Sequence, residues 1–225
     1  MSDERIVATD LGEGRLVVRR ARKPIATLLV SHGAGGGIEA RDLVALAAQL
    51  PGQGITVARF EQPWRRAGRK VATPPPTLDV GLRAAAAALR VRTPLVVGGR
   101  SAGARSACRT AVELGAAGCL AISFPLHPPG KPERSRLDEL AGAGVPTLVV
   151  QGERDPMGRP EEFPDPLPGR TDLAVVPGAD HGLAVPKKGP VSEDEAMGIV
   201  VESALEWIVR EVVGNEGTTW GVLPP

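Results

Sequence analysis

The sequence predicts a single-domain α/β fold in which an eight-stranded, mostly parallel sheet carries helices on both faces. Two observations support this prediction. Short β-rich runs alternate with stretches of helical periodicity along the chain, and from residue 25 onward the runs are almost entirely apolar. Strands that alternate with helices are typical of a parallel sheet between two helix layers. Nearly continuous apolar strands are expected where both faces of the sheet are buried.

Eight segments are predicted as strands by their content of Val, Ile and Leu and by the turn residues that bound them. The first two flank the sequence LGEG, which favours an antiparallel pair. The predicted strands are residues 5–9, 15–20, 25–31, 55–60, 94–99, 119–124, 147–152 and 172–177.

Apolar residues recur at helical spacing between these strands. The last helix is predicted to begin after Ser192, which has capping-box spacing with Glu195, and to end at Gly214. The predicted helices are residues 39–50, 77–91, 102–114, 134–142 and 193–213. We expect one domain over residues 1–213, followed by an aperiodic tail over residues 214–225.

The composition is that of an ordinary globular protein. The net charge of +1 gives no electrostatic signal for nucleic acid or an acidic membrane surface. No apolar stretch approaches the roughly 20 residues of a membrane span, and the first ten residues lack the apolar centre of a signal peptide. Cys108 and Cys119 lie in apolar patterns and are predicted to be reduced packing residues, which favours the cytoplasm.

The stretch VVGGRSAGAR, residues 96–105, predicts a reactive serine at a tight turn. Ser101 is the centre of a G-x-S-x-G motif between a predicted strand and a predicted helix, which is the context that the motif requires. The motif places glycines two positions from the serine because the turn packs backbones closely. A serine can also serve simply as a helix N-cap, but the context favours a nucleophile.

A serine nucleophile needs a base, and the sequence offers three histidines. His32 follows the strand at 25–31, His127 lies in the proline-bounded sequence PLHPPGKP, and His181 lies in GADHGL after the last predicted strand. When the chain order is serine, acid, histidine, the base lies on a late loop. We therefore predict His181 as the base and expect His127 to be structural.

The acid that orients the base is predicted to be Asp155. It lies in QGERDP, just past the strand at 147–152, and between the predicted nucleophile and base. Asp180 is a competitor but would have to fold back onto the ring of its neighbour, and Asp165 lies in a proline-rich loop.

Backbone amides are predicted to bind the oxyanion that forms during acyl transfer. One donor is the N–H of Ala102, and the other comes from HGAGGG after the strand at 25–31, where Ala34 is the first candidate and Gly35 the next. Such preorganised donors contribute roughly 3 kcal/mol each. No G-K-[ST] follows the glycines, which excludes a Walker loop, and their spacing fits a dinucleotide fingerprint poorly. We expect no cofactor and no metal.

Taken in order, the sequences HGAG, GRSAG, ERDP and ADHG resemble the α/β-hydrolase superfamily over residues 5–213. This resemblance implies the hydrolase fold with its second strand antiparallel, and it implies Ser101, Asp155 and His181 as the catalytic triad. More narrowly, VSHGAGG, GGRSAGAR, FPLHPPGKPE and QGERDP are similar to the small group that contains the testis-expressed and KAT8 regulatory subunit-like proteins, related to dienelactone hydrolases. Dienelactone hydrolases proper use a cysteine nucleophile, whereas this chain has serine.

The surroundings of the site predict small or flexible soluble substrates. The segment between residues 124 and 147 is too short for the helical cap of lipases and epoxide hydrolases. Trp64, in the basic loop EQPWRRAGRK, is a candidate substrate-binding residue, although such a loop can also be a solvated charged surface. Gly35 and Arg100 are further candidates, and Arg100 can pair with a carboxylate such as Glu61.

We therefore expect a serine hydrolase that cleaves small carboxylic esters or thioesters through an acyl-enzyme on Ser101. The alternative is a non-catalytic protein of the same fold that acts as a complex subunit, as some members of the narrower group do. The intact set of Ser101, Asp155 and His181 favours the enzyme.

Overall fold

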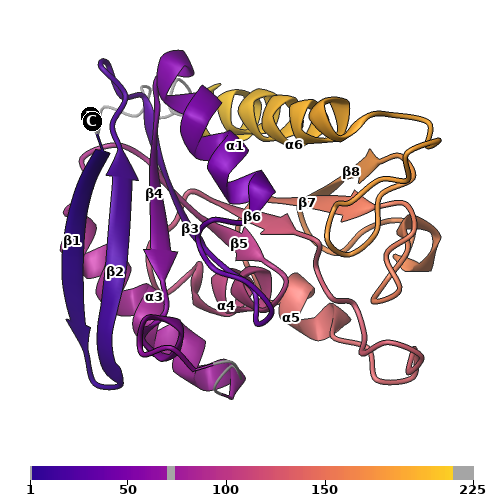
Figure 1. The fold of residues 1–225 in the computed structure, drawn as a ribbon, viewed down its shortest axis with the longest axis horizontal. Helices are drawn as coiled ribbons and strands as arrows, with labels where there is room; N and C mark the ends of the chain where they lie inside the picture. Colours follow the sequence, from indigo (N-terminus) through magenta and orange to yellow (C-terminus); the bar gives the residue numbers. More distant parts are fainter. Residues whose placement is uncertain (1, 70–73, 215–225) are drawn as a thin grey trace, which may run out of the picture.

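The computed structural model describes residues 2–69 and 74–214. Within them, eight strands form one sheet: β1 (Ser2–Thr9), β2 (Gly12–Arg19), β3 (Ala26–Ser31), β4 (Ile55–Glu61), β5 (Leu95–Arg100), β6 (Gly118–Ile122), β7 (Thr147–Gly152) and β8 (Thr171–Val176). Their order is β1-β2-β4-β3-β5-β6-β7-β8 (Figure 1). β2 runs antiparallel to both β1 and β4, and the other neighbouring pairs are parallel. The predicted sheet is confirmed.

Helices cover both faces of this sheet, as predicted. They are α1 (Arg41–Gln49), α2 (Pro63–Arg66), α3 (Pro75–Leu89), α4 (Ala102–Thr110), α5 (Leu137–Ala141) and α6 (Glu193–Trp207), with the short 3-10 segments η1 (Leu50–Gln53) and η2 (Pro160–Glu162) and the π-helix η3 (Ile208–Val213). α1 and α6 pack together on one face, along the top of Figure 1, and α3, α4 and α5 lie on the other.

The alternation of side chains along the strands builds one apolar core on each face. In β3, Leu28 and Val30 belong to the cluster that contains residues of α1 and α6, whereas Leu29 belongs to the cluster that contains residues of α3 and α4. Every residue of β3 is buried, as expected for a strand covered on both faces.

The strand order reverses between β3 and β5. The chain continues from β3 to β4 on one side and from β5 to β6 on the other. In an open α/β sheet, ligands bind outside the carboxyl ends of the strands at such a switch point. The fold therefore brings HGAGGG, which follows β3, to the same edge as Ser101, which follows β5.

Some helix boundaries differ from the sequence prediction. The predicted helix at 102–114 ends at Thr110, and the helix predicted over 193–213 is α-helical only to Trp207 before η3 continues it. α2 was missed because four residues are too few to show a helical period. The capping box is present: Ser192 Oγ accepts the Glu195 N–H at 3.2 Å, and the Glu195 carboxylate accepts the Ser192 N–H at 2.7 Å.

None of the helices in the described part of the chain has both the length and the apolar character that crossing a membrane requires. The predicted tail at 214–225 lies outside the described residues, apart from Gly214.

Candidate active site

Ser101 occupies a strained turn between β5 and α4. Its backbone has φ 53° and ψ −112°, a region that residues other than glycine rarely adopt. A Cβ added to Gly99 would lie 2.5 Å from the carbonyl carbon of Gly103, and one added to Gly103 would lie 2.5 Å from the carbonyl oxygen of Ser31. These backbone contacts explain the two glycines of the motif, because any side chain there would force the turn apart.

His181 and Asp155 reach Ser101 from two later loops. Nε2 of His181 lies 2.9 Å from Oγ of Ser101, and Nδ1 lies 2.8 Å from Oδ2 of Asp155. Asp155 follows β7 and His181 follows β8, so all three side chains come from the carboxyl ends of parallel strands. The structure brings together the three residues that the sequence predicts as a triad.

The Asp155 carboxylate is fully buried and held from several sides. Oδ1 accepts the Met157 N–H at 2.8 Å, and Oδ2 accepts the side-chain amide of Gln151 at 2.9 Å. That amide also donates to the Gly158 carbonyl at 2.7 Å, which ties the loop after β7 to the strand. Sequence reasoning missed Gln151, although a polar residue in the otherwise apolar run TLVVQG was a usable signal.

The competing acids serve other purposes. Oδ1 of Asp180 accepts the N–H groups of Gly182 at 2.7 Å and Ala184 at 2.9 Å, so this carboxylate closes its own turn. Asp165 is exposed. Neither faces the imidazole of His181 in the way that Asp155 does.

His32 is buried behind the glycine-rich loop. Its Nε2 accepts the Gln62 N–H at 3.0 Å, so Nδ1 carries the proton and donates to the Gly33 carbonyl at 2.8 Å. Burial lowers the pKa of His32, which keeps the ring neutral. This histidine therefore shapes the loop rather than facing Ser101.

His127 has a structural role, as expected. Its Nδ1 lies 2.9 Å from the Pro128 carbonyl oxygen and its Nε2 lies 2.6 Å from the Glu162 carboxylate. The contact with the Pro128 carbonyl raises the pKa of His127, and Glu162 adds to the rise. The ring joins the loop after β6 to η2.

The loop after β3 lies directly against the serine. A Cβ added to Gly33 would lie 3.1 Å from the Ser101 Cβ and 3.2 Å from the Arg100 carbonyl oxygen. Ala34 follows in this loop, and a Cβ added to Gly35 would meet nothing within 4 Å. The N–H of Ala102 belongs to the first turn of α4, whose amides have no acceptor within the helix. Both predicted donor segments thus adjoin the serine.

Trp64 is buried, whereas the sequence predicts it in an exposed basic loop. Its side chain is 4% exposed on α2. Its ring packs edge-on against the imidazole of His32, with 5.5 Å between ring centroids. Pro63 and Trp64 are the buried residues of α2, and Trp64 supports His32 behind the glycine-rich loop.

Arg100 also differs from its predicted contact. Glu61 pairs with Arg15 at 2.9 Å rather than with Arg100. The Arg100 guanidinium instead forms an ion pair with Asp42 of α1 and donates to the backbone carbonyl of His181. Sequence reasoning missed Asp42, because no motif marks it.

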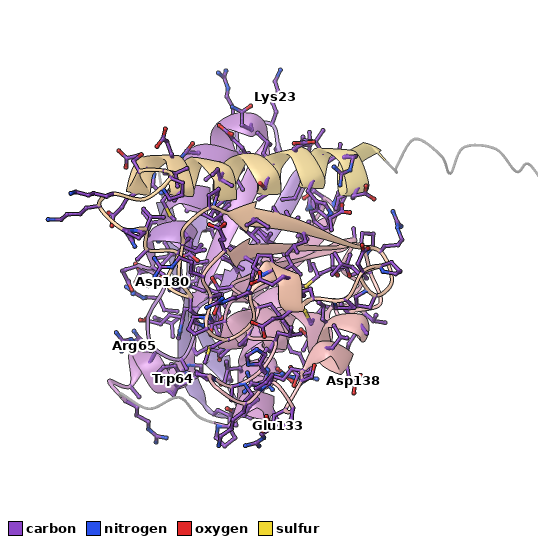
Figure 2. The ribbon with its side chains drawn as sticks, turned by 90° about the vertical axis from the view of Figure 1, so that its right-hand side faces the viewer. Lys23, Trp64, Arg65, Glu133, Asp138 and Asp180 are labelled. Atoms are coloured by element: carbon purple, nitrogen blue, oxygen red, sulfur yellow. The ribbon has the colours of Figure 1, made fainter. Side chains whose placement is uncertain are left out.

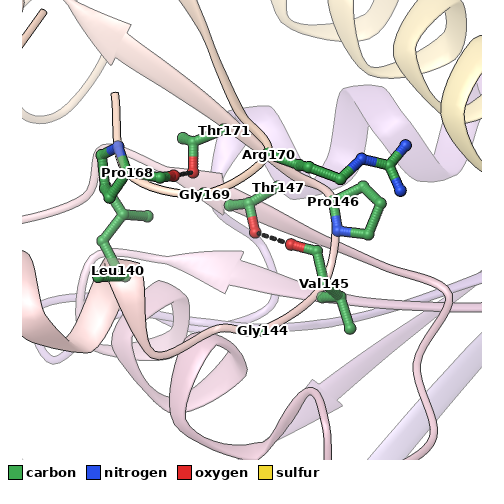
Figure 3. Close-up of a pocket in the computed structure, with 10 residues that line it drawn as sticks. Leu140, Gly144, Val145, Pro146, Thr147, Pro168, Gly169, Arg170 and Thr171 are labelled. Atoms are coloured by element: carbon green, nitrogen blue, oxygen red, sulfur yellow. Dashed lines mark hydrogen bonds between the residues drawn. The ribbon is translucent and has the colours of Figure 1, made fainter. Parts of the chain in front are cut away.

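No cap covers this edge of the sheet within the described residues. Between β6 and β7 the chain forms loops and the five-residue α5. Figure 2 shows Trp64, Arg65 and Asp180, which follow strands, on one side of the molecule, and Lys23, which precedes β3, at its top. A separate pocket of about 260 Å³ lies at the opposite, amino ends of β7 and β8 (Figure 3).

The two cysteines are free and buried, as expected of reduced packing residues. Sγ of Cys108 on α4 lies 3.9 Å from Sγ of Cys119 on β6. This contact, together with burial, raises the pKa of the Cys119 thiol. Neither thiol approaches Ser101 as a reactive group.

Comparisons with known proteins agree with this architecture. No curated protein sequence matches the chain. Among solved structures, a dienelactone hydrolase from Anabaena variabilis has a TM-score of 0.73 at 17% identity, covering 94% of this chain and 98% of that one. An α/β serine hydrolase without a lid from Xanthomonas campestris has a TM-score of 0.67 at 21% identity, covering 92% and 94%. Est1E from Butyrivibrio proteoclasticus has a TM-score of 0.69 at 16% identity, covering 92% and 99%.

These structural likenesses concern the fold. The sequence itself matches the alpha/beta hydrolase domain over residues 24–209. Because this match runs from β3 through β8 and into α6, it includes every loop that carries a candidate catalytic side chain. The chain therefore belongs to the alpha/beta hydrolase domain family.

Proposed function

We propose that the chain is a serine hydrolase that cleaves small carboxylic esters or thioesters through an acyl-enzyme on Ser101. The observation that carries the proposal is the unbroken line of contacts from Ser101 Oγ to His181 Nε2 at 2.9 Å and from His181 Nδ1 to Asp155 Oδ2 at 2.8 Å. A hydroxyl, an imidazole and a buried carboxylate in this order are the parts that nucleophilic acyl transfer requires.

In the first half of the reaction, His181 Nε2 takes the proton from the Ser101 hydroxyl while Oγ bonds to the acyl carbon. The carbonyl oxygen becomes an oxyanion, which accepts the N–H groups of Ala34 and Ala102. The tetrahedral species collapses when the alcohol or thiol departs with the proton from His181. In the second half, water takes the place of the alcohol, and the acid and free Ser101 are released.

Asp155 fixes the tautomer of the base. Its Oδ2 accepts the Nδ1–H of His181, which leaves the lone pair on Nε2 free to accept the serine proton. When the imidazole becomes charged during turnover, the buried carboxylate stabilises it. Met157 and Gln151 hold the carboxylate itself in the required orientation.

The open edge of the sheet supports soluble substrates with small or flexible acyl groups. The short connection between β6 and β7 leaves the serine side of the sheet without a cap in the described residues. Among the similar structures, Est1E has also been solved with ferulic acid bound, and another neighbour is a dienelactone hydrolase. Gly35, which faces open space beside Ala34, is proposed as part of the substrate contact surface.

We also propose that the protein acts in the cytoplasm on small molecules and does not bind nucleic acid. The net charge of +1 and the two buried free thiols support this placement. The motifs FPLHPPGKPE and QGERDP support membership of the narrower testis-expressed and KAT8 regulatory subunit-like group. A non-catalytic complex subunit, the alternative for such a relative, would carry an unactivated serine.

Reaction with a fluorophosphonate probe separates these functions. The wild type should label rapidly and should hydrolyse members of a panel of short-chain esters and thioesters, whereas Ser101→Ala should do neither while it retains its fold by circular dichroism. Labelling of the alanine variant at the wild-type rate would place the nucleophile elsewhere. An unreactive wild type would favour the complex subunit.

A further inference from the structure

Arg100, the residue before Ser101, connects three parts of the active site. It ends β5, and its side chain reaches both α1 and the loop after β8. Its Nε lies 3.3 Å from Oδ2 of Asp42, and its Nη2 donates a 2.9 Å hydrogen bond to the backbone carbonyl oxygen of His181. One guanidinium therefore ties the strand of the nucleophile to α1 and to the loop that carries the base.

Asp42 is the buried anchor of this arrangement. It lies in the first turn of α1 and is 2% exposed. Burial raises the pKa of Asp42, and the charge of Arg100 opposes that rise. A planar guanidinium can face a carboxylate along one edge and a carbonyl along another, which a lysine ammonium cannot do with the same rigidity. The charge of Asp42 thus holds the Arg100 guanidinium close to α1.

Apart from Arg100, the loop around His181 is held by its own turn and by the loop after β7, where the Arg154 N–H donates to the Ala179 carbonyl at 2.8 Å and Asp155 contacts the His181 ring. Asp180 accepts the N–H groups of Gly182 and Ala184 and thereby closes that turn. These bonds set the shape of the loop but do not attach the peptide of His181 to the central strands. The bond from Arg100 does so, at the residue whose ring must meet the serine.

The same contacts argue against a substrate-binding role for Arg100. Its Nη2 donates to the His181 carbonyl, its Nε lies in an ion pair 3.3 Å from the Asp42 carboxylate without a hydrogen bond between them, and its side chain is 18% exposed. A substrate carboxylate would have to displace Asp42, which already provides the buried negative charge.

We propose that Arg100, anchored by Asp42, is a positioning residue that keeps the imidazole of His181 within hydrogen-bonding distance of Ser101 during turnover. This role rests on the hydrolase function proposed above and deepens it. The imidazole must hold its place while it takes the proton and returns it, so loss of the tie should lower kcat rather than raise KM.

A double variant, Arg100→Met with Asp42→Asn, tests the role without leaving an unpaired charge in the interior. A single Arg100→Met change would strand the Asp42 carboxylate and destabilise the fold by itself. We expect the double variant to unfold cooperatively, as the wild type does. On soluble esters its kcat should fall roughly 10- to 100-fold while its KM changes less than about threefold.

The matched control is Arg105→Met. Arg105 on α4 is about as exposed as Arg100 and forms an ion pair with Glu139 of α5, on the other face of the sheet. Its loss should affect thermal stability and leave kcat unchanged. A second readout is chemical rescue in Arg100→Ala, which keeps Asp42 and is assayed well below its lowered Tm. Guanidinium chloride at a low, non-denaturing concentration should raise its kcat, and sodium chloride at equal ionic strength should not.

The outcomes are distinct. A raised KM with wild-type kcat would assign Arg100 to substrate binding. Wild-type kcat and KM in a stable double variant would show that Arg100 only neutralises the charge of Asp42. Either result overturns the positioning role, while Ser101-dependent hydrolysis by the wild type stands. If the wild type shows no Ser101-dependent reaction with esters or the fluorophosphonate probe, the hydrolase function itself fails, and the role of Arg100 fails with it.

Discussion

At the residue scale, the site depends on a carboxylate that water cannot reach. Asp155 is 0% exposed, whereas the side chain of His181 that it faces is 25% exposed. A buried carboxylate without hydrogen-bond donors is costly in free energy. The Asp155 carboxylate therefore strongly favours accepting the Nδ1–H of His181. The contacts with Met157 and Gln151 distribute the negative charge over further donors and fix the orientation of the carboxylate.

Asp155→Asn should lower kcat by roughly 1,000- to 10,000-fold, because an amide can present its N–H₂ group to Nδ1 and so favour the wrong tautomer of His181. Asp180→Asn keeps the side-chain oxygen that closes its turn and should retain most activity. Steady-state kinetics on one ester compare the two. If Asp180→Asn is the more damaging change, the acid is misassigned.

The contact between His127 and Glu162 should make stability depend on pH. Both ring nitrogens of His127 face acceptors, so the folded state favours the charged ring and the pKa of His127 is raised. Because the pKa is higher in the folded state, the charged ring stabilises the folded protein fully below the unfolded pKa of about 6.5. This stabilisation is lost as the pH rises through the pKa of the folded state. The pKa of Glu162 is lowered, first by the Arg159 N–H and then by His127, so its own contribution is lost on strong acidification.

We therefore expect the difference in Tm between the wild type and His127→Gln to be larger near pH 5.5 than at pH 8, roughly the two sides of the histidine titration. Thermal melts across this range measure it. A difference that stays constant or grows with pH would show that the neutral ring carries the contact.

Single residues differ in how far sequence could reveal them. Ser101, Asp155 and His181 each follow a recognisable strand in the order of a known motif, so their meeting could be predicted. Gln151 and Asp42 act through contacts between distant parts of the chain, and no local pattern distinguishes them from ordinary polar residues.

At the scale of elements, the turn between β5 and α4 is built on backbone contact. Gly103→Ala would place a Cβ 2.5 Å from the Ser31 carbonyl oxygen, and the strand cannot yield as a side chain would. We expect a loss of about 1–3 kcal/mol in the free energy of unfolding, as for an overpacked core, with slower probe labelling of Ser101. Chemical denaturation and labelling rates measure the two effects.

Gly198→Ala is the matched control within α6, because a Cβ there would meet nothing within 4 Å. It should raise the free energy of unfolding by up to about 1 kcal/mol through helix propensity, and labelling of Ser101 should stay as in the wild type. Equal destabilisation by both substitutions would show that the close approach of Gly103 is not what constrains the turn.

Element existence could be predicted better than element ends. Each central strand was identified by its apolar run, whereas α2 is too short to show a period and the change from α6 to the π-helix leaves no mark in the pattern of apolar residues. The burial of Trp64 follows from α2, so missing the helix also misplaced the tryptophan.

At the scale of the whole molecule, no cap covers the serine edge of the sheet in residues 2–69 and 74–214. Activity should therefore follow Michaelis kinetics on soluble short-chain esters, with no jump in rate as the substrate concentration passes its critical micelle concentration. A titration of one p-nitrophenyl ester series across that point checks this. A sharp rise at micelle formation would require a segment that opens at a lipid surface.

The order of the strands could not be read from their periodicity. Alternation predicted a parallel sheet with two helix layers, but the crossing from β4 over β3 to β5 follows from tertiary packing. That crossing creates the switch point at which the site lies. The motifs alone locate the site in the sequence, and the strand order explains why their loops meet.

The buried pair of thiols has a practical consequence. Cys108 lies on the helix that begins at the serine turn and Cys119 lies on the strand beneath it, and the chain contains no other cysteine. Because both thiols are buried between α4 and β6, a thiol reagent modifies them only after local or global opening of this region. The rate of modification under native conditions therefore measures opening beside the nucleophile without an added label.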